Sequence, residues 1–228
     1  MHPTNKQLKG VIFDVDGTLV NSNDAHARAW LEALRERGVD VPFSVIRNAI
    51  GMGGDKLLPS VAGVDAESEL GRQLAQRRGE VFRTQFLPTL RPFAQARALL
   101  LALRAMGLKL AVASSAEKAE LGALLGLAQV TDLLEGATSS NDAKHSKPDP
   151  DIVGAALRQL DLAPEHALLI GDTPYDAEAA ARAGARSIVL RCGGRSDRDL
   201  AGALAIYDDP ADLLAHLQTS PICNGVAA

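Results

Sequence analysis

Short apolar runs alternate with longer segments of helical periodicity along most of this chain. The apolar runs predict strands at 9–13, 108–113, 167–170, 186–190 and 205–207. The helical pattern, with Gly or Pro at the segment ends, predicts helices at 93–106, 117–125, 151–160, 176–183 and 210–217. Asp209 precedes the last of these as its expected N-cap. Alternation of this kind is typical of strand–helix–strand units, so the expected fold class is α/β with a Rossmann-like parallel sheet.

The segment from residue 21 to residue 87 departs from this alternation, because it contains no apolar run that predicts a strand. Its periodicity predicts helices at 24–37, 43–50, 55–61 and 66–86. Asp65 is the expected N-cap of the last helix. We therefore expect residues 21–87 to form an all-helical domain inserted after the first strand. Residues 1–20 and 88–228 would then make up the α/β core domain.

Composition and charge exclude several classes of protein. The 228 residues are 46% hydrophobic and 23% charged, which is ordinary for a globular chain. The net charge of −4 gives no electrostatic footprint for nucleic acid or an anionic membrane. The N-terminal sequence MHPTNKQLKGVIFD lacks the apolar region of a signal peptide, and the apolar run around 98–103 is too short to span a membrane. We expect a cytoplasmic protein and, without a long heptad pattern, a monomer.

Two aspartates stand at the exit of the first predicted strand, in GVIFDVDGTLVNS. Residues i and i+2 of a strand point the same way, so Asp14 and Asp16 would leave the sheet together, at the end where open α/β sheets bind ligands. Carboxylates ~4 Å apart repel by about 4 kcal/mol at an effective dielectric constant of about 20, so they need a cation, a shared proton or separation. A solvated turn is the alternative, because turns favour Asp and Gly.

Three later segments favour a shared site, because each follows an apolar run and supplies a matching chemical group. Ser114 ends a strand where a helix begins, a place suited to a phosphate oxygen. Lys147, in HSKPDPDI, is held stiffly by Pro148 and Pro150, which follow it, as a fixed positive charge. Asp172 ends another strand, and Asp176 lies at the start of the next helix. Singly, these residues fit an N-cap, a surface charge and solvated carboxylates; together, at strand ends, they indicate one site.

With these motifs in this order, the sequence resembles the haloacid dehalogenase superfamily, in the branch of phosphoglycolate phosphatases and β-phosphoglucomutases. The family motifs are matched by DVDGTL, by the strand that ends in Ser114, by KPDP with Lys147, and by GDTPYD. The helical segment at 21–87 is similar to the helical cap of the family. The resemblance covers nearly the whole chain and implies a Rossmann-like core with an inserted cap.

The resemblance also implies an activity, which is Mg²⁺-dependent hydrolysis of a small phosphorylated metabolite such as phosphoglycolate or a sugar phosphate. Asp14 would be the nucleophile and form an aspartyl-phosphate. Asp16 would protonate the leaving oxygen and later deprotonate the attacking water. Ser114 and Lys147 would hold the transferring phosphoryl group, where charge stabilisation supplies most of the catalysis.

A magnesium site follows from the same resemblance. Mg²⁺ would lie between Asp14, the backbone carbonyl of Asp16 and Asp172, with Asp176 as a further ligand or as a partner of the ligands. Hard oxygen ligands suit this metal. Lys147 would balance the crowded carboxylates.

The predicted cap bears on the choice between a phosphatase and a β-phosphoglucomutase-type phosphotransferase. A mutase needs a cap cation for a second phosphate, and near the expected position the chain has Gly54, with Arg47 and Lys56 close by in sequence. This arrangement favours hydrolysis. His26 is either a substrate contact or a buried helix residue, and Gly53 belongs to a loop that closes over the site or to a simple helix–helix turn. A catalytically silent binding module on the same fold is the alternative of a different class.

Overall fold

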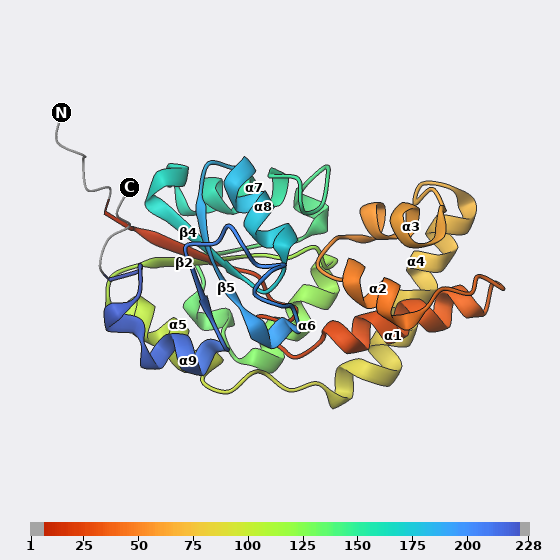
Figure 1. Cartoon of the computed structure of the whole chain (residues 1–228), viewed down its shortest axis with the longest axis horizontal. Coiled ribbons are helices and arrows are strands. Elements are labelled where there is room, and N and C mark those ends of the chain that lie inside the picture. Colours follow the sequence, from red (N-terminus) through yellow and green to blue (C-terminus); the bar gives the residue numbers. More distant parts are fainter. Residues whose placement is uncertain (1–6, 224–228) are drawn as a thin grey trace.

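The computed structural model describes residues 7–223; residues 1–6 and 224–228, which belong to the predicted core domain, lie outside this range. Six parallel strands form one sheet in the order β3-β2-β1-β4-β5-β6 (Figure 1). The strands are β1 (Gly10–Phe13), β2 (Lys109–Ala113), β3 (Gly136–Thr138), β4 (Ala167–Gly171), β5 (Arg186–Leu190) and β6 (Ala205–Tyr207). The predicted α/β class with a parallel sheet is confirmed.

Helices cover both faces of the sheet, so its central strands are apolar on both sides. In β1, Val11 and Phe13 point into one apolar cluster and Ile12 into the other. The first cluster is covered by α5 (Ala96–Ala105), α6 (Lys118–Ala128) and α9 (Pro210–Ala215). The second is covered by α7 (Asp151–Leu160) and α8 (Pro174–Arg182). This double burial explains why the strand sequences are continuous apolar runs.

The strand order places a topological switch point beside β1. The chain passes from β1 to β2 on one side and later adds β4 on the other, so Phe13 lies between Val112 and Ile170. Asp14 and Asp172 directly follow β1 and β4. In open sheets of this kind, ligands bind in the crevice outside the carboxyl ends of the strands at the switch point.

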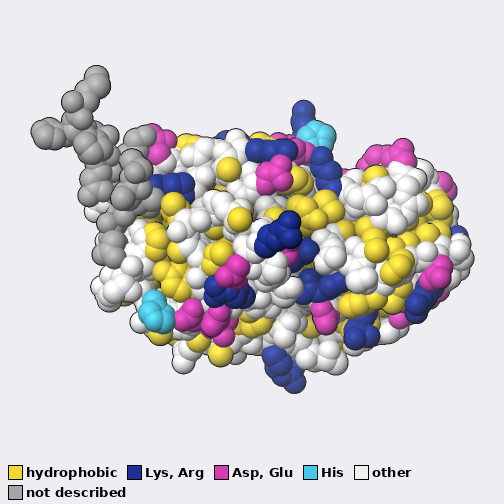
Figure 2. All heavy atoms as spheres, viewed as in Figure 1, with side chains coloured by type: hydrophobic (Ala, Val, Ile, Leu, Met, Phe, Trp, Pro, Cys, Tyr) yellow, Lys and Arg dark blue, Asp and Glu magenta, His cyan; other side chains and the backbone are white. Residues whose placement is uncertain are grey.

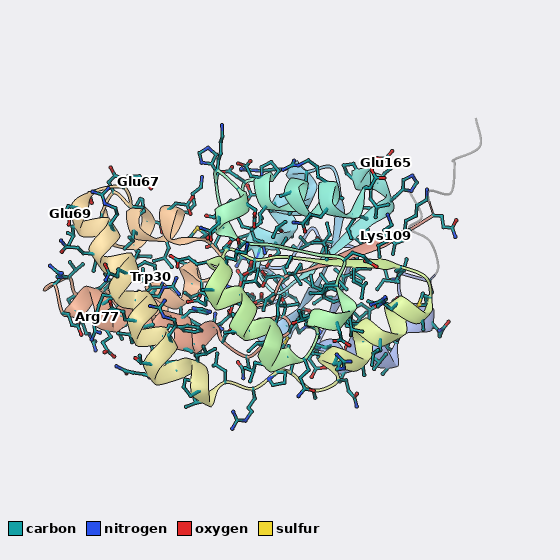
Figure 3. All side chains as sticks on the ribbon, turned by 180° about the vertical axis from the view of Figure 1, so that it is seen from behind. Trp30, Glu67, Glu69, Arg77, Lys109 and Glu165 are labelled. Atoms are coloured by element: carbon teal, nitrogen blue, oxygen red, sulfur yellow. The ribbon has the colours of Figure 1, made fainter. Side chains whose placement is uncertain are left out.

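A separate group of helices lies beyond this end of the sheet, on the right in Figure 1. It consists of α1 (Asn23–Arg35), α2 (Phe43–Ala49), α3 (Gly54–Ala62) and α4 (Glu69–Val81). These helices bury an apolar cluster of their own, which includes Leu34, Ile46 and Trp30, the last labelled in Figure 3. We call α1 to α4 the cap and the rest the core; boundaries at residues 21 and 87 stay a prediction.

The chain enters and leaves the cap through two neighbouring segments. The amide of Asn21 donates to the carbonyl of Arg91 at 3.1 Å, and the amide of Phe93 donates to the carbonyl of Leu19 at 2.9 Å. The two crossings therefore run side by side.

The structure corrects the predicted course of the last cap helix. Ser68 is the N-cap, because its hydroxyl accepts from the amide of Gly71 at 3.0 Å. Asp65 caps nothing in this helix and instead accepts from the amide of Glu67. The expected continuous helix also changes at Val81 into a π-helical turn, Phe82–Phe86.

Other boundaries differ from prediction for local reasons. The short edge strand β3 was not predicted, because the sequence Gly-Ala-Thr carries almost no apolar signal. The helix expected from residue 93 begins at Ala96, since Gln95 has a φ of +60° and breaks the helical backbone. Asp209 is confirmed as the N-cap of α9, accepting from the amide of Asp212 at 2.9 Å. Short 3₁₀ turns lie at Leu87–Thr89, Thr131–Leu133, Ser140–Asp142, Pro164–His166, Arg191–Gly193 and Leu217–Thr219.

The surface mixes charges of both signs. On the face shown in Figure 2, Lys and Arg side chains are interspersed with Asp and Glu. No helix between residues 7 and 223 is both long and apolar enough to cross a membrane.

Candidate active site

Three carboxylates gather at the carboxyl ends of β1 and β4. Asp14, Asp172 and Asp176 are buried, with 7%, 0% and 1% of their surface exposed. One oxygen from each lies within 4.8 Å of the others. Burial, with the neighbouring charges of Asp176 and Asp16, raises the pKa of Asp14 to about 7 against the attraction of Lys147. Burial and the same crowding raise the pKa of Asp172 well above its usual value.

Lys147 lies inside this acidic cluster and is 1% exposed. Its ammonium donates to Asp14 Oδ1 at 2.5 Å and to Asp176 Oδ1 at 2.7 Å. Burial lowers the pKa of Lys147, but the two carboxylates outweigh this and hold it above its ordinary value. With all three carboxylates ionised, one ammonium leaves two negative charges, which matches the charge of one divalent cation.

Asp172 is held by side chains from two other segments. Thr18 Oγ1 donates to Asp172 Oδ1 at 3.2 Å, and Asn23 Nδ2 donates to Asp172 Oδ2 at 2.8 Å. A Cβ atom at Gly17 or Gly193 would overlap the Asp172 carboxylate, so both glycines allow a close approach. Gly17 also has a φ of +78° in the turn after β1.

The donor atoms fit a magnesium ion. Asp14, Asp172 and Asp176 supply converging carboxylate oxygens, the ligand type that Mg²⁺ prefers. Asn23 Oδ1 is buried without a hydrogen-bond partner among residues 7–223. Asp176 has fewer free lone pairs for a metal than the other two carboxylates, because its Oδ1 accepts from Lys147 and its Oδ2 accepts from Thr173 in the capping box of α8. Asp14 and Asp172 are therefore the stronger ligand candidates.

Asp16 faces the cap. Its Oδ1 accepts from Ser22 Oγ at 2.5 Å and lies 2.7 Å from His26 Nε2. Burial raises the pKa of Asp16, but the attraction of His26 and these hydrogen bonds outweigh it, so the pKa is below its usual value. His26 is itself 7% exposed and stacks on Phe82 at 4.0 Å. The two alternatives for His26 are compatible, since it is buried and also lies at the site.

A small pocket of about 50 Å³ lies between core and cap. Its lining residues come from both parts: Asp14, Asp16, Ser115, Ala116 and Glu120 from the core, and His26, Trp30, Arg78 and residues 50–54 from the cap. A space of this size holds a few water molecules. A larger open hollow of about 1000 Å³ lies along α7, and none of the predicted site residues lines it.

The structure places the remaining predicted residues differently. Ser114 is buried and does not line the pocket; its Oγ accepts from the amide of Ala116 at 3.1 Å. Gly53 lines the pocket, and its amide donates to Ser146 at 3.1 Å. Lys56 lies outside it and donates to Asp149 at 2.6 Å.

Arg47, the other cation considered for a second phosphate, also lies outside the pocket. It donates to Asp24 Oδ1 at 2.6 Å and to the carbonyl of Gly193.

Asn23, Arg78 and Glu120 are among the site residues that the sequence did not predict. Asn23 directly precedes the helix predicted from residue 24, and a single Asn at such a place carries no specific signal of a site. Arg78 and Glu120 lie on separate helices, α4 and α6, and become partners only through the tertiary fold. No local pattern of residues signals such a pair.

Comparison with known proteins agrees with this geometry. The model of the haloacid dehalogenase-like hydrolase family matches residues 11–190. A phosphoglycolate phosphatase of Nitrosospira multiformis is 30% identical over 198 residues, which cover 85% of this chain and 87% of that protein. A hydrolase from Pseudomonas syringae is 29% identical, with a TM-score of 0.86 over 92% of this chain and 98% of its own.

A putative β-phosphoglucomutase from Bacteroides vulgatus shares the fold, with a TM-score of 0.84 and 24% identity over 94% of this chain and 89% of its own. The family match covers well over half of the sequence and contains β4, all of β1 except its first residue, and the carboxylates that follow these strands. This chain belongs to the haloacid dehalogenase-like hydrolase family.

Proposed function

We propose that this chain is a Mg²⁺-dependent phosphatase that hydrolyses a small phosphomonoester through an aspartyl-phosphate. The observation that carries the proposal is the pocket in which Asp14 and Asp16 lie together, with Lys147 bound to Asp14. The relative named phosphoglycolate phosphatase supports a phosphate ester as the substrate.

The reaction has two balanced steps. An Asp14 oxygen attacks phosphorus, the bond between phosphorus and the leaving oxygen breaks, and Asp16 gives that oxygen a proton. Water then attacks phosphorus, Asp16 accepts its proton, and the bond to Asp14 breaks, releasing phosphate. Because the pKa of Asp16 is low, His26, which lies 2.7 Å from it, would share the proton that is delivered.

The other residues of the cluster hold the reacting groups in place. Asp14, the Asp16 backbone carbonyl and Asp172 would hold Mg²⁺, which when bound offsets the negative charge of the cluster and of the phosphoryl group. Asp176 anchors Lys147 beside Asp14. Ser114 would support the phosphate loop from within, because its Oγ accepts from the Ala116 amide.

Hydrolysis is favoured over the mutase alternative by the pocket lining. Neither Arg47 nor Lys56 lines the pocket, so neither of them supplies the cation that a second phosphate needs. The silent-module alternative predicts a lost catalytic group, whereas Asp14, Asp16 and Lys147 are all present and adjacent. A cytoplasmic monomer without nucleic-acid or membrane partners stays a prediction.

The test is phosphate release from a panel of phosphomonoesters, with Mg²⁺ and with EDTA. We expect release only with Mg²⁺, and a fall on the order of a thousandfold or more in Asp14→Asn, because the nucleophile is lost. Asp40→Asn, at a side chain 91% exposed, is the matched control and should behave as wild type. Unchanged turnover in Asp14→Asn would exclude this mechanism. Conversion of β-glucose 1-phosphate to glucose 6-phosphate, with a bisphosphate primer and no phosphate release, would favour the mutase.

A further inference from the structure

One part of the pocket wall has no role in the two steps above. Arg78, on α4 of the cap, and Glu120, on α6 of the core, both line the pocket and face each other. Arg78 Nη1 donates to both Glu120 oxygens, at 3.0 and 2.9 Å. The Glu120 side chain is 4% exposed and that of Arg78 is 14% exposed, so the pair is largely shielded from solvent.

The pairing consumes the available positive charge. Among the described residues that line the pocket, Arg78 is the one Lys or Arg, and its charge is already balanced by Glu120. His26 lies against Asp16. A carboxylate or second phosphate on the substrate would therefore find no free cation and would be repelled by the Glu120 carboxylate.

Arg78 also has an unused donor. Its Nε is buried and lacks a hydrogen-bond partner within residues 7–223. The guanidinium lies over the Trp30 ring at 5.4 Å, which supports its position from the cap side. A hydroxyl oxygen can accept from Nε without adding charge, and a buried donor that gains an acceptor is stabilised.

We propose that this pocket selects phosphomonoesters whose leaving group is uncharged and carries hydroxyls, and that Glu120 rejects leaving groups with a second anion. The proposal rests on the proposed phosphatase function and narrows its substrate class. Phosphate esters of polyols and sugars fit it. Phosphoglycolate does not, although the relative compared above is named for that substrate.

The test uses two pairs of esters that differ only in a CH₂OH or a carboxylate. These are 2-hydroxyethyl phosphate against 2-phosphoglycolate, and glycerol 3-phosphate against 3-phosphoglycerate. We expect kcat/KM to favour the alcohol in both pairs by about tenfold or more, because placing a carboxylate beside the paired Glu120 side chain is costly. Phosphate release is measured with Mg²⁺ for every ester, and p-nitrophenyl phosphate serves as a general substrate.

Variants assign the preference to Glu120. Glu120→Gln frees the charge of Arg78 while keeping a hydrogen-bonding side chain. The ratio of kcat/KM for the alcohol to kcat/KM for the carboxylate should therefore shift toward the carboxylates by about tenfold. The double variant Arg78→Met with Glu120→Gln should lose this gain, because no Lys or Arg then remains among the described residues that line the pocket. Glu117→Gln, at an exposed position before the same helix, should leave the wild-type ratio unchanged.

The outcomes separate the two proposals. If no ester releases phosphate, including p-nitrophenyl phosphate, the phosphatase function is wrong and this inference falls with it. If the wild type releases phosphate but prefers the carboxylate of each pair, the inference alone is wrong. An unchanged ratio in folded Glu120→Gln, checked by thermal unfolding, also overturns it; the wild-type ratio decides if that variant does not fold.

Discussion

The Asp172 carboxylate shows how the site is held at the scale of single residues. It is fully buried beside two other carboxylates, and burial keeps its pKa well above the usual value. Hydrogen bonds from Thr18 and Asn23 fix both of its oxygens, and Gly193 lies directly against it. The position of this carboxylate is therefore set by the fold, which lowers the cost of ordering it around a metal.

Replacing Asn23 tests this arrangement. Asn23→Ala removes the donor to Asp172 Oδ2, so the carboxylate should lose its orientation. Loss of such a partner typically weakens metal binding or activity by roughly 10–100-fold, and we expect an increase of this size in the Mg²⁺ concentration for half-maximal phosphate release. Asn21→Ala is the control, since Asn21 is exposed two residues away. The same Mg²⁺ dependence in both variants would show that Asn23 does not orient the site.

At the scale of elements, the success of sequence reasoning depended on how local each signal is. Asp14 and Asp172 were predicted because each directly follows a buried apolar strand, and the strand order then brings them together. The three-residue strand β3 was not predicted, because it carries no apolar run. The Arg78–Glu120 pair was not predicted either, since the two side chains meet only where cap and core pack together.

Substitutions at two helical glycines, Gly122 and Gly71, should change the free energy of unfolding in opposite directions. Gly122, inside α6, has open space where a Cβ would lie, so Gly122→Ala should raise the free energy of unfolding by roughly 0.5–1 kcal/mol through helix propensity. Gly71, in the first turn of α4, lies against the carbonyls of Asp65 and Ala66, which a Cβ would overlap. Gly71→Ala should therefore lower the free energy of unfolding.

Chemical denaturation of the two glycine variants measures both effects. The close approach at Gly71 also explains why α4 does not begin at residue 66, where the sequence predicted its start. The chain before Ser68 folds back over Gly71 instead of continuing the helix. Stabilisation by both substitutions would contradict this close approach.

At the scale of the whole molecule, the buried cluster links stability to pH. The folded pKa of Asp14 is about 7, whereas an unfolded aspartate titrates near about 4. A carboxyl whose pKa is raised in the folded state destabilises the fold where it is ionised. This penalty is absent below about pH 4, grows as pH rises, and is complete only above the folded pKa.

Mg²⁺ should offset this penalty most where the cluster is ionised. We expect saturating Mg²⁺ to raise the unfolding temperature by roughly 5–10 °C at pH 8, and by less at pH 6, where protons compete for the ligands. Thermal unfolding with Mg²⁺ and with EDTA at both pH values measures the difference. Asp172→Asn should abolish the Mg²⁺ effect. Equal shifts at pH 6 and pH 8 would mean that the ion binds without displacing protons from the cluster.

The paired crossings between core and cap have a consequence for how this molecule can change. Asn21 bonds Arg91 and Phe93 bonds Leu19, so the ends of the cap are tied together at the core surface. The four cap helices therefore form one insertion whose two ends join the core at neighbouring positions. Mutations in the cap can therefore remodel the wall that meets the leaving group, while Asp14 and Asp172 keep their places in the sheet. New substrates can be acquired in one part of the chain and the chemistry inherited in the other.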